Sequence, residues 1–195
     1  MKFYSTPRDE TFYGGPGVDT VYFSGKGQDY TVTVYSKSEQ DVRDYGNYIN
    51  DGHDKLFSIE RLNFSDGTLA FDTDGAAGQG YRIYQAAFDR KPDASGLGYW
   101  VRTLDNGANL VDVGADFVNS SEFRKMYGPN LSNSEFVQEL YYNVLGRTGE
   151  QSGVNYWADQ LSYGHTRGWV LASFSESAEN VAGVAPSISD GIWYT

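Results

Sequence analysis

The pattern of hydrophobic and polar positions divides the chain into two parts. Up to about residue 72, apolar and polar side chains alternate in short runs rich in β-branched and aromatic residues, which predicts strands over 21–23, 30–35, 55–64 and 68–72. From residue 81, apolar residues recur three or four positions apart, which predicts amphipathic helices. We therefore expect an α+β protein, with a small β-rich module over residues 1–75 and an all-α module over residues 80–195.

Turn residues punctuate this pattern. Asp66-Gly67 stands between two alternating runs, which is a strong signal for an antiparallel hairpin. Residues 73–80 read Thr-Asp-Gly-Ala-Ala-Gly-Gln-Gly, a composition typical of a flexible joint. The joint separates the two predicted modules.

One segment of the β-rich module has the spacing of a calcium-binding repeat. Residues 14–21 fit the pattern G-G-x-G-x-D-x-U, in which glycines allow tight turns and an aspartate supplies a carboxylate. This predicts a β-roll-like turn in which Gly15, Gly17 and Asp19 contribute ligands to Ca²⁺. A degenerate turn that keeps the geometry without the metal is the alternative, since a functional roll stacks several such repeats.

A second acidic turn lies shortly before the run at 55–64. Asp51 and Asp54 flank Gly52 there, and their carboxylates could complete an oxygen shell around the same Ca²⁺. The alternative is an ordinary loop rich in aspartate, in which the side chains bond to nearby backbone. The stretch from Asp54 to Ala70 resembles the closing strands of bacterial calcium-dependent repeat (RTX-like) secreted proteins. That resemblance implies an extracellular setting and a self-folding β module, and it implies no activity.

The helical part contains an internal repeat. Ten residues recur at one constant offset of 57 positions without a gap, so residues 81–127 and 138–184 are predicted to be two copies of one helical unit. The recurring pairs are Tyr84/Tyr141, Arg90/Arg147, Gly96/Gly153, Tyr99/Tyr156, Trp100/Trp157, Leu104/Leu161, Gly107/Gly164, Phe117/Phe174, Ser120/Ser177 and Glu122/Glu179.

These repeats carry the motifs of a known family. The segments Asp-Arg-Lys-Pro-Asp-Ala-Ser-Gly-Leu-Gly-Tyr-Trp at 89–100 and Phe-Val-Gln-Glu-Leu-Tyr-Tyr-Asn-Val-Leu-Gly-Arg at 136–147 resemble the family called domain of unknown function 4214. The resemblance covers residues 80–195, and it departs from the pattern at 148–150. It implies a role in recognition or attachment at bacterial surfaces, often to polysaccharide, and it supplies no catalytic residues.

The repeat also singles out candidate site residues. Arg90, Trp100, Arg147 and Trp157 are predicted to be structural anchors of the two copies, because their spacing places them among core positions. Surface aromatic and amide side chains suit carbohydrate, since rings stack on sugar faces and amides bind hydroxyls. The predicted ligand-binding residues are Tyr99, Tyr156, Tyr142, Asn143 and Trp193, with ordinary packing as the alternative. Duplicated units create a cleft at their interface, so the groove between the copies is the expected site.

Charge and composition exclude several classes of partner. The net charge is −11 and no basic stripe exists, so we expect no binding to nucleic acid or to anionic membrane surfaces. No apolar run is long enough to span a bilayer, and the first residues lack the apolar region of a classical signal peptide. The absence of cysteine excludes disulfides.

Catalysis has little support in the sequence. The two histidines, His53 and His165, lie in different segments, and no hydrolase, metalloprotease or phosphate-loop motif appears. We therefore predict no enzymatic activity, although paired carboxylates for glycoside cleavage remain an alternative. The predicted function is a non-enzymatic adhesion protein, extracellular or on the surface of a cell or phage-like particle, that recognises bacterial polysaccharide or capsule. The alternative is a structural subunit of a surface layer, appendage or particle spike, which forms a homo-oligomer or binds a host-surface protein.

Overall fold

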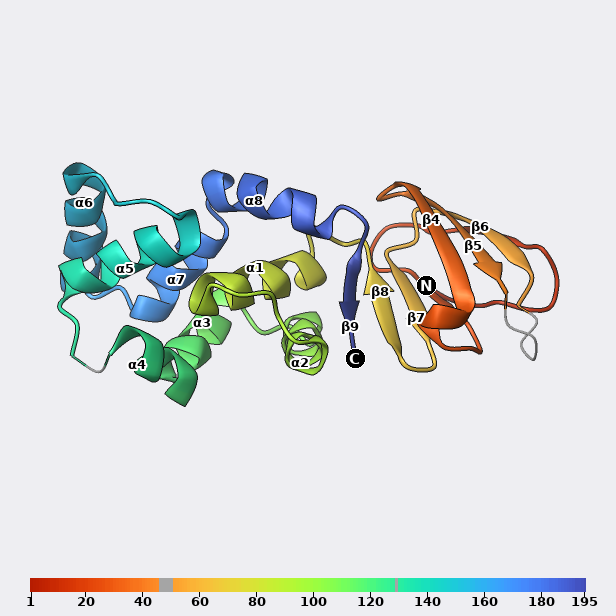
Figure 1. Ribbon diagram of the computed structural model, residues 1–195, viewed down its shortest axis with the longest axis horizontal. Helices are drawn as coiled ribbons and strands as arrows, with labels where there is room; N and C mark the ends of the chain where they lie inside the picture. Colours follow the sequence, from red (N-terminus) through yellow and green to blue (C-terminus); the bar gives the residue numbers. More distant parts are fainter. Residues whose placement is uncertain (46–50, 129) are drawn as a thin grey trace. The chain divides into compact units, whose positions relative to one another are not determined.

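The chain folds into two compact units. The computed structural model describes residues 1–45, 51–128 and 130–195 (Figure 1). The first unit contains residues 1–78 and 187–195, and the second contains residues 79–186. Strands dominate the first unit and helices form the second, which confirms the predicted α+β class. The predicted helical module ran to residue 195, whereas the last nine residues belong to the β unit. Among the described helices, none has the length and apolar content that crossing a membrane requires.

Two sheets form the β unit (Figure 1). One has the strand order β1-β3-β7-β8-β9 and the other the order β2-β6-β5-β4. Residues of both sheets, among them Val21, Leu62 and Leu56, are buried in one hydrophobic core. In chain order the strands are β1 (Lys2–Tyr4), β2 (Thr11–Tyr13), β3 (Thr20–Tyr22), β4 (Tyr30–Ser36), β5 (Glu39–Asp44), β6 (His53–Phe57), β7 (Arg61–Phe64), β8 (Gly67–Ala70) and β9 (Ile192–Tyr194).

The first three strands form a parallel coil. They start at residues 2, 11 and 20, nine positions apart, and alternate between the two sheets. β1 pairs in parallel with β3, with Phe3 opposite Val21. Phe3, Phe12 and Val21 occupy the same place in each nine-residue step and pack on the core. This is the β-roll-like part of the expected architecture, and antiparallel pairing follows in β4, β5 and β8.

The predicted single strand over 55–64 is wrong. The segment forms β6 and β7, which lie in different sheets. Between them, Ser58 has a φ of 55°, a left-handed conformation that a continuous strand does not contain, and Ile59 turns into the core. The hairpin predicted at Asp66-Gly67 is confirmed, because β7 and β8 pair antiparallel with Phe64 opposite Gly67.

Helices of the second unit repeat with the same offset as the residues. α1, α2 and α4 return 57 positions later as α5, α6 and α8 with identical lengths, and α3 returns as α7 one residue shorter. The helices are α1 (Ala76–Phe88), α2 (Ala94–Asp105), α3 (Leu110–Asn119), α4 (Ser121–Tyr127), α5 (Asn133–Leu145), α6 (Gln151–Ser162), α7 (Arg167–Ser175) and α8 (Ala178–Val184).

The two copies meet where α3 packs against α7. Gly114 of α3 faces Gly168 of α7 so closely that a Cβ on Gly114 would lie 2.5 Å from the carbonyl oxygen of Gly168. Around this contact, side chains of both copies share one hydrophobic core, including Phe117, Phe136 and Leu171. A side chain on either glycine would push the helices apart, so these glycines set the distance between the copies.

Candidate functional site

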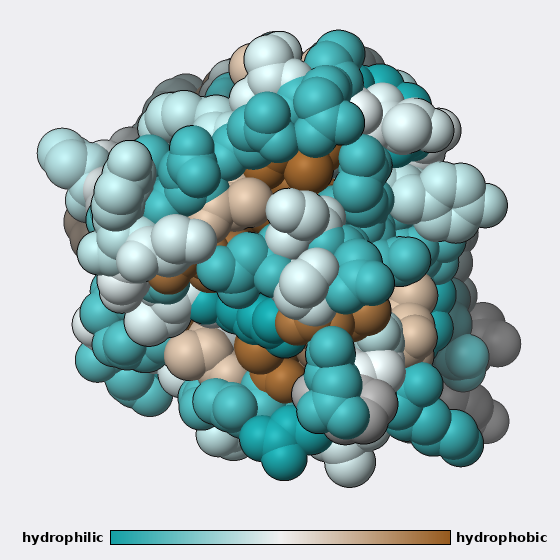
Figure 2. Space-filling view, turned by 90° about the vertical axis from the view of Figure 1, so that its left-hand side faces the viewer, coloured by the Kyte–Doolittle hydropathy of each residue, from teal (hydrophilic) through white to brown (hydrophobic). Residues whose placement is uncertain are grey.

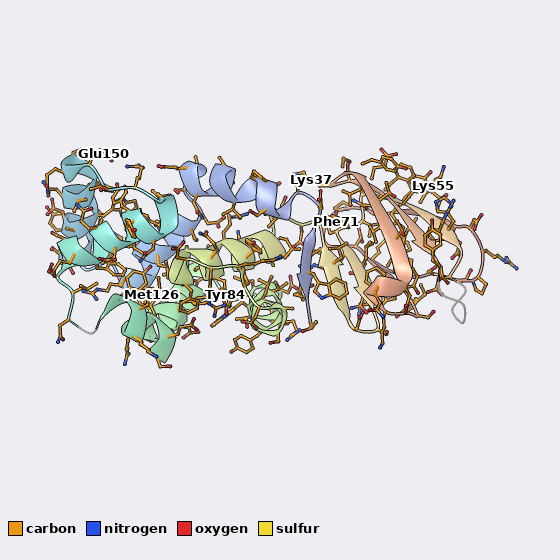
Figure 3. All side chains as sticks on the ribbon, viewed as in Figure 1. Lys37, Lys55, Phe71, Tyr84, Met126 and Glu150 are labelled. Atoms are coloured by element: carbon orange, nitrogen blue, oxygen red, sulfur yellow. The ribbon has the colours of Figure 1, made fainter. Side chains whose placement is uncertain are left out.

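Each copy contains the same arginine anchor. In the first copy, Arg90 donates to the Glu122 carboxylate at 2.9 Å and to the Tyr84 hydroxyl at 2.9 Å. Its guanidinium also lies 5.0 Å from the centre of the Tyr84 ring. Tyr84, labelled in Figure 3, belongs to α1. These contacts tie the loop after α1 to helix α4.

The second copy reproduces the anchor 57 residues later. Arg147 donates to Glu179 at 2.7 Å and lies 5.1 Å from the Tyr141 ring centre. A further ion pair with Glu150, at 2.9 Å, is particular to this copy. Hydrogen bonds from Arg147 lower the pKa of the Glu179 carboxyl. The matched contacts give both arginines a structural role, holding a loop to a helix.

The repeated tryptophans hold exposed tyrosine rings in place. Trp100 is half-buried and packs against Phe117 at 4.7 Å, while Trp157 is half-buried and packs against Phe174 at 5.4 Å. The preceding residue, Tyr99 or Tyr156, places its ring edge-on to that tryptophan, at 4.8 and 5.2 Å respectively. These tyrosines remain 58% and 54% exposed. Each copy therefore presents a ring to solvent from a fixed base.

The predicted ligand-binding residues do not line one groove. Tyr99 is on α2 and Tyr156 on α6, and Figure 1 shows these helices at opposite ends of the helical unit. Tyr142 is exposed on α5, and its neighbour Asn143 hydrogen-bonds the hydroxyl of Tyr127. The fifth residue, Trp193, belongs to β9 of the β unit, where its ring packs on Phe64 at 5.9 Å.

Asp19, the first predicted calcium ligand, has protein donors around it. Its side chain is buried, and it accepts a hydrogen bond from the backbone N–H of Gly15 at 2.6 Å and pairs with the amino group of Met1. Gly17 has a φ of 100°, which only glycine adopts readily. The carboxylate thus closes the tight turn between β2 and β3.

Asp51 and Asp54 stabilise other turns. The carboxylate of Asp51 accepts from the Ser24 N–H at 2.7 Å and from the Tyr30 hydroxyl at 2.5 Å. The carboxylate of Asp54 accepts from the Ser5 hydroxyl at 2.6 Å and from the N–H of Glu10 at 3.0 Å. Burial, together with the nearby negative charges of Glu10 and Asp51, raises the pKa of Asp54 to about 6.

The predicted ligand set does not fit a single calcium site. Asp19, Asp51 and Asp54 each bind a different turn, and backbone N–H groups, which repel a cation, occupy carboxylate oxygens that calcium would need. In the described part of the chain, no three or more histidine, aspartate or glutamate side chains gather so that they could hold a metal ion. Calcium binding at these residues is therefore a sequence-based prediction that their geometry does not favour, and the addition of calcium to the protein tests it.

The two histidines have separate surroundings. His53, on β6 of the β unit, lies between Asp41 and Arg43, with its Nε2 3.3 Å from the Asp41 carboxylate and its Nδ1 3.2 Å from the guanidinium. His165, in the helical unit, stacks on Trp169 at 4.0 Å. Both rings have contacts that suit a structural role, and the absence of enzymatic activity stays a prediction.

The sequence patterns did not single out Arg124 or Arg167, which line a cavity beside the α3–α7 contact. A signal existed in the repeat itself. At the 57-residue offset, Arg124 corresponds to Val181 and Arg167 to Leu110, so both arginines break the match between the copies. A search for recurring residues overlooks residues that are present in one copy alone.

Comparison with known proteins adds the family. No curated protein and no solved structure gives a significant match to the chain. One family model does match, over residues 81–113 and 114–184, which together make up more than half of the sequence. Both matched segments fall in the duplicated helical unit. The chain therefore belongs to the family described as Domain of unknown function (DUF4214).

Proposed function

We propose that the helical unit is a non-enzymatic binding unit that holds a polysaccharide on the rings of Tyr99 and Tyr156. The observation that carries the proposal is the matched pair of exposed rings, each fixed edge-on to a tryptophan in its own copy. Sugar rings have apolar C–H faces that pack on aromatic rings. A ring already held in place loses little conformational entropy when a sugar binds to it.

The arrangement suits a polymer better than a single sugar. The two rings lie on helices at opposite ends of the unit (Figure 1), so one small ligand does not reach both. A repeating polysaccharide offers the same sugar many times along its length. Binding at one ring then raises the local concentration of sugar at the other, which strengthens weak single contacts.

One face of the helical unit, at the end that contains α6, has the composition expected for binding a polar ligand. The side that faces left in Figure 1 is mostly hydrophilic, and Figure 2 shows hydrophobic side chains on it only as small, separate areas. Stable protein docking commonly uses a broad apolar patch. Hydroxyl-rich sugars instead combine isolated rings with polar neighbours.

The proposal includes a location outside the cell, or on a phage-like particle, where such polymers are met. Its support is the likeness of residues 54–70 to the closing strands of secreted repeat proteins. The net charge of −11 is compatible with this location, since it disfavours nonspecific adsorption to nucleic acid and to anionic lipid.

Binding of the full chain to a panel of bacterial polysaccharides tests the proposal. Affinity electrophoresis compares the wild type with Tyr99→Ala, Tyr156→Ala and the double variant. Each single change should weaken binding by about 1–2 kcal/mol, the usual cost of removing an aromatic contact, and the double change should remove it. Tyr163→Ala is the matched control, because Tyr163 is 80% exposed and its counterpart in the first copy is Asn106.

Two outcomes would contradict the proposal. One is equal affinity for the wild type and for the double variant. The other is a panel that stays blank with and without calcium. If light scattering then rises with protein concentration, the chain is a self-associating structural subunit instead.

A further inference from the structure

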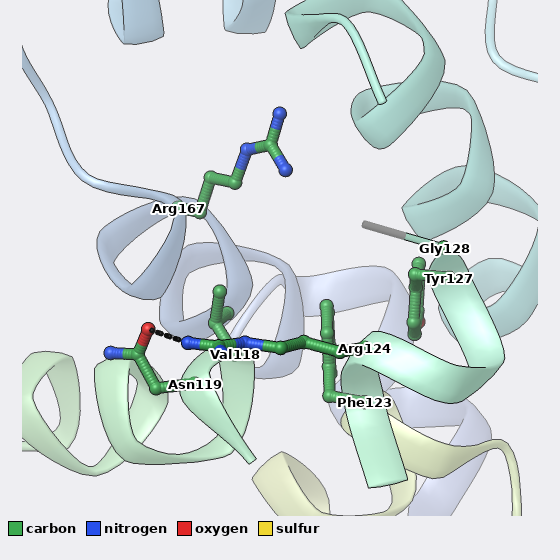
Figure 4. Close-up of a pocket in the computed structure, with 7 residues that line it drawn as sticks. All are labelled: Val118, Asn119, Phe123, Arg124, Tyr127, Gly128 and Arg167. Atoms are coloured by element: carbon green, nitrogen blue, oxygen red, sulfur yellow. Dashed lines mark hydrogen bonds between the residues drawn. The ribbon is translucent and has the colours of Figure 1, made fainter. Parts of the chain in front are cut away.

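A cavity lies at the junction of the two copies. Its volume is about 360 Å³, and helices α3 and α4 of the first copy and the first residue of α7 in the second copy form its walls (Figure 4). Asn119 and Arg124 are exposed at its edge, so the cavity opens to solvent. Binding pockets for small ligands commonly have volumes in this range.

Two arginines of this cavity lack an acidic partner. Arg124 donates to the amide oxygen of Asn119 at 3.2 Å, as the dashed line in Figure 4 shows. Arg167 donates to the carbonyl of Leu131 and lies 4.8 Å from the centre of the Phe136 ring. Within residues 1–45, 51–128 and 130–195, neither arginine pairs with a carboxylate. Each guanidinium has five N–H donors, so most of them remain available for a ligand.

Three other arginines of the helical unit are each paired with a glutamate, namely Arg82 with Glu176 at 2.7 Å, Arg90 with Glu122 and Arg147 with Glu179. Acidic residues outnumber basic ones by 26 to 15, so carboxylates are abundant. Two unpaired guanidinium groups at one cavity therefore form a local positive site on an acidic protein.

Apolar groups line the rest of the cavity. Phe123 and Tyr127 are buried and stack on one another, with ring centres 3.9 Å apart and planes 7° from parallel. Val118 of α3 adds an aliphatic surface. An anion that also carries an apolar face would fill this combination better than a bare ion, which would leave the aromatic wall without a contact.

The cavity has no counterpart in the rest of the duplication. At the 57-residue offset, Arg124, Tyr127 and Arg167 correspond to Val181, Val184 and Leu110. The counterpart of Phe123 is Asn180, which is buried and donates to the carbonyl of Ser175 at 2.8 Å. Among the described residues, the matching positions therefore lack the arginines and aromatic rings of this cavity, whereas the tyrosine platforms occur twice.

We infer that this cavity binds a carboxylate-bearing sugar residue, a uronic acid, of the bound polysaccharide. The carboxylate pairs with Arg124 and Arg167, which bind planar anions through two parallel N–H donors. The apolar face of the sugar packs on half-buried Val118 and reaches the small exposed part of Phe123. The inference rests on the proposed function and names its ligand class. The acidic surface elsewhere repels a polyanion, so recognition of the carboxylate is confined to this cavity.

Titration of the full chain with a galacturonic acid tetrasaccharide tests the inference. The same tetrasaccharide with its carboxyl groups reduced to alcohols is the second probe, and inorganic phosphate is the third. Calorimetry should give one site per chain for the acidic probe. Arg124→Gln and Arg167→Gln should each weaken that site about tenfold, the effect of one lost charged hydrogen bond. Binding of the reduced probe should not change in either variant.

Lys125→Gln is the matched control. Lys125 follows Arg124 on α4 and carries the same charge, but it does not line the cavity. Its loss should leave the affinity for the acidic probe unchanged. Equal weakening by Lys125→Gln would overturn the inference, because net charge alone would then explain the effect. Thermal melts of all three variants check that they are folded.

Other outcomes separate this inference from the proposed function. If the Arg124 and Arg167 side-chain N–H signals in NMR do not move at the highest soluble galacturonate concentration, the inference is wrong. It is also wrong if phosphate competes as strongly as the acidic tetrasaccharide, since the cavity is then a general anion site. If only Tyr99→Ala and Tyr156→Ala weaken polysaccharide binding, the proposed function stands and this inference fails. If only the arginine variants do so, the tyrosine platforms fail.

Discussion

Replacing Gly114 by alanine tests how the two helical copies are joined. Gly114 is in the middle of α3, and an added Cβ would lie 2.5 Å from the carbonyl oxygen of Gly168 in α7. The obstructing atom is backbone, so it cannot rotate away as the end of a side chain would. The helices must separate, and the packing of Val113 and Leu171 in the shared core must loosen with them.

The expected magnitude is the difference of two terms. Alanine favours the helix over glycine by about 1 kcal/mol. Overpacking of a well-packed contact costs about 1–3 kcal/mol. Because the contact is far shorter than any real Cβ contact and involves backbone, we expect the upper part of that range. The Gly114→Ala variant should therefore lose about 1–2 kcal/mol of unfolding free energy.

Gly183→Ala is the matched control for this change. Gly183 is also in a helix, α8, and nothing lies within 4 Å of its added Cβ. It should gain as much as about 1 kcal/mol from helix propensity alone. Urea unfolding followed by tryptophan fluorescence measures both variants. If Gly114→Ala is as stable as the wild type, the close approach of α3 and α7 is not what holds the copies together.

Three further predictions concern helix capping, calcium and pH. Asp93→Ala removes the hydrogen bond that caps α2 at the Gly96 N–H, and it should lower the free energy of unfolding in urea by about 1 kcal/mol. Glu150→Ala, at the equivalent position without such a bond, should lower it less. Equal losses in the two variants would contradict the capping argument. Millimolar calcium should leave the melting temperature unchanged, because Asp19 already accepts protein donors, and a rise that Asp19→Ala abolishes would instead support the calcium site. Because the pKa of Asp54 is raised to about 6 in the folded protein, its protonated carboxyl stabilises the fold below about pH 4, by at most about 3 kcal/mol. This stabilisation is lost as pH rises through 6. Urea unfolding across this range should show the loss in the wild type and not in Asp54→Asn.

The helical half was largely predictable because its signal is repeated. A constant offset of 57 between pairs such as Trp100 and Trp157 requires two similar local structures, and the helix bounds follow the same offset. Helix starts also have local signals, since Ser132 and Glu135 form a capping box at the start of α5. What the offset did not predict is where the copies touch, because Gly114 and Gly168 are not a recurring pair.

The β half was harder for physical reasons. β1, β2 and β9 have three residues each, too few for a periodic pattern to emerge. The left-handed turn at Ser58 needs no glycine or proline, so nothing marked the break between β6 and β7. β9 joins the sheet from the far end of the chain, and pairing over such a distance leaves no local trace.

The candidate site could be predicted from the sequence only in part, for a similar reason. The pattern identified Tyr99 and Tyr156 as outward-facing rings, and both are exposed. It also placed them in one groove, whereas they lie on α2 and α6 at opposite ends of the helical unit. The acidic residues predicted to gather around calcium instead bind separate turns. A carboxylate that suits a cation equally suits backbone N–H groups, and spacing alone does not distinguish the two.

Binding to whole cells tests most directly whether the duplicated helical unit attaches the protein to polysaccharide. The wild type and the Tyr99→Ala/Tyr156→Ala variant are incubated with capsulated bacteria and with a capsule-free strain, each with and without chelator. We predict that the wild type is retained on capsulated cells alone, that the double variant is lost from them, and that chelator changes neither result. Equal retention on both strains, or full retention of the double variant, would contradict the account.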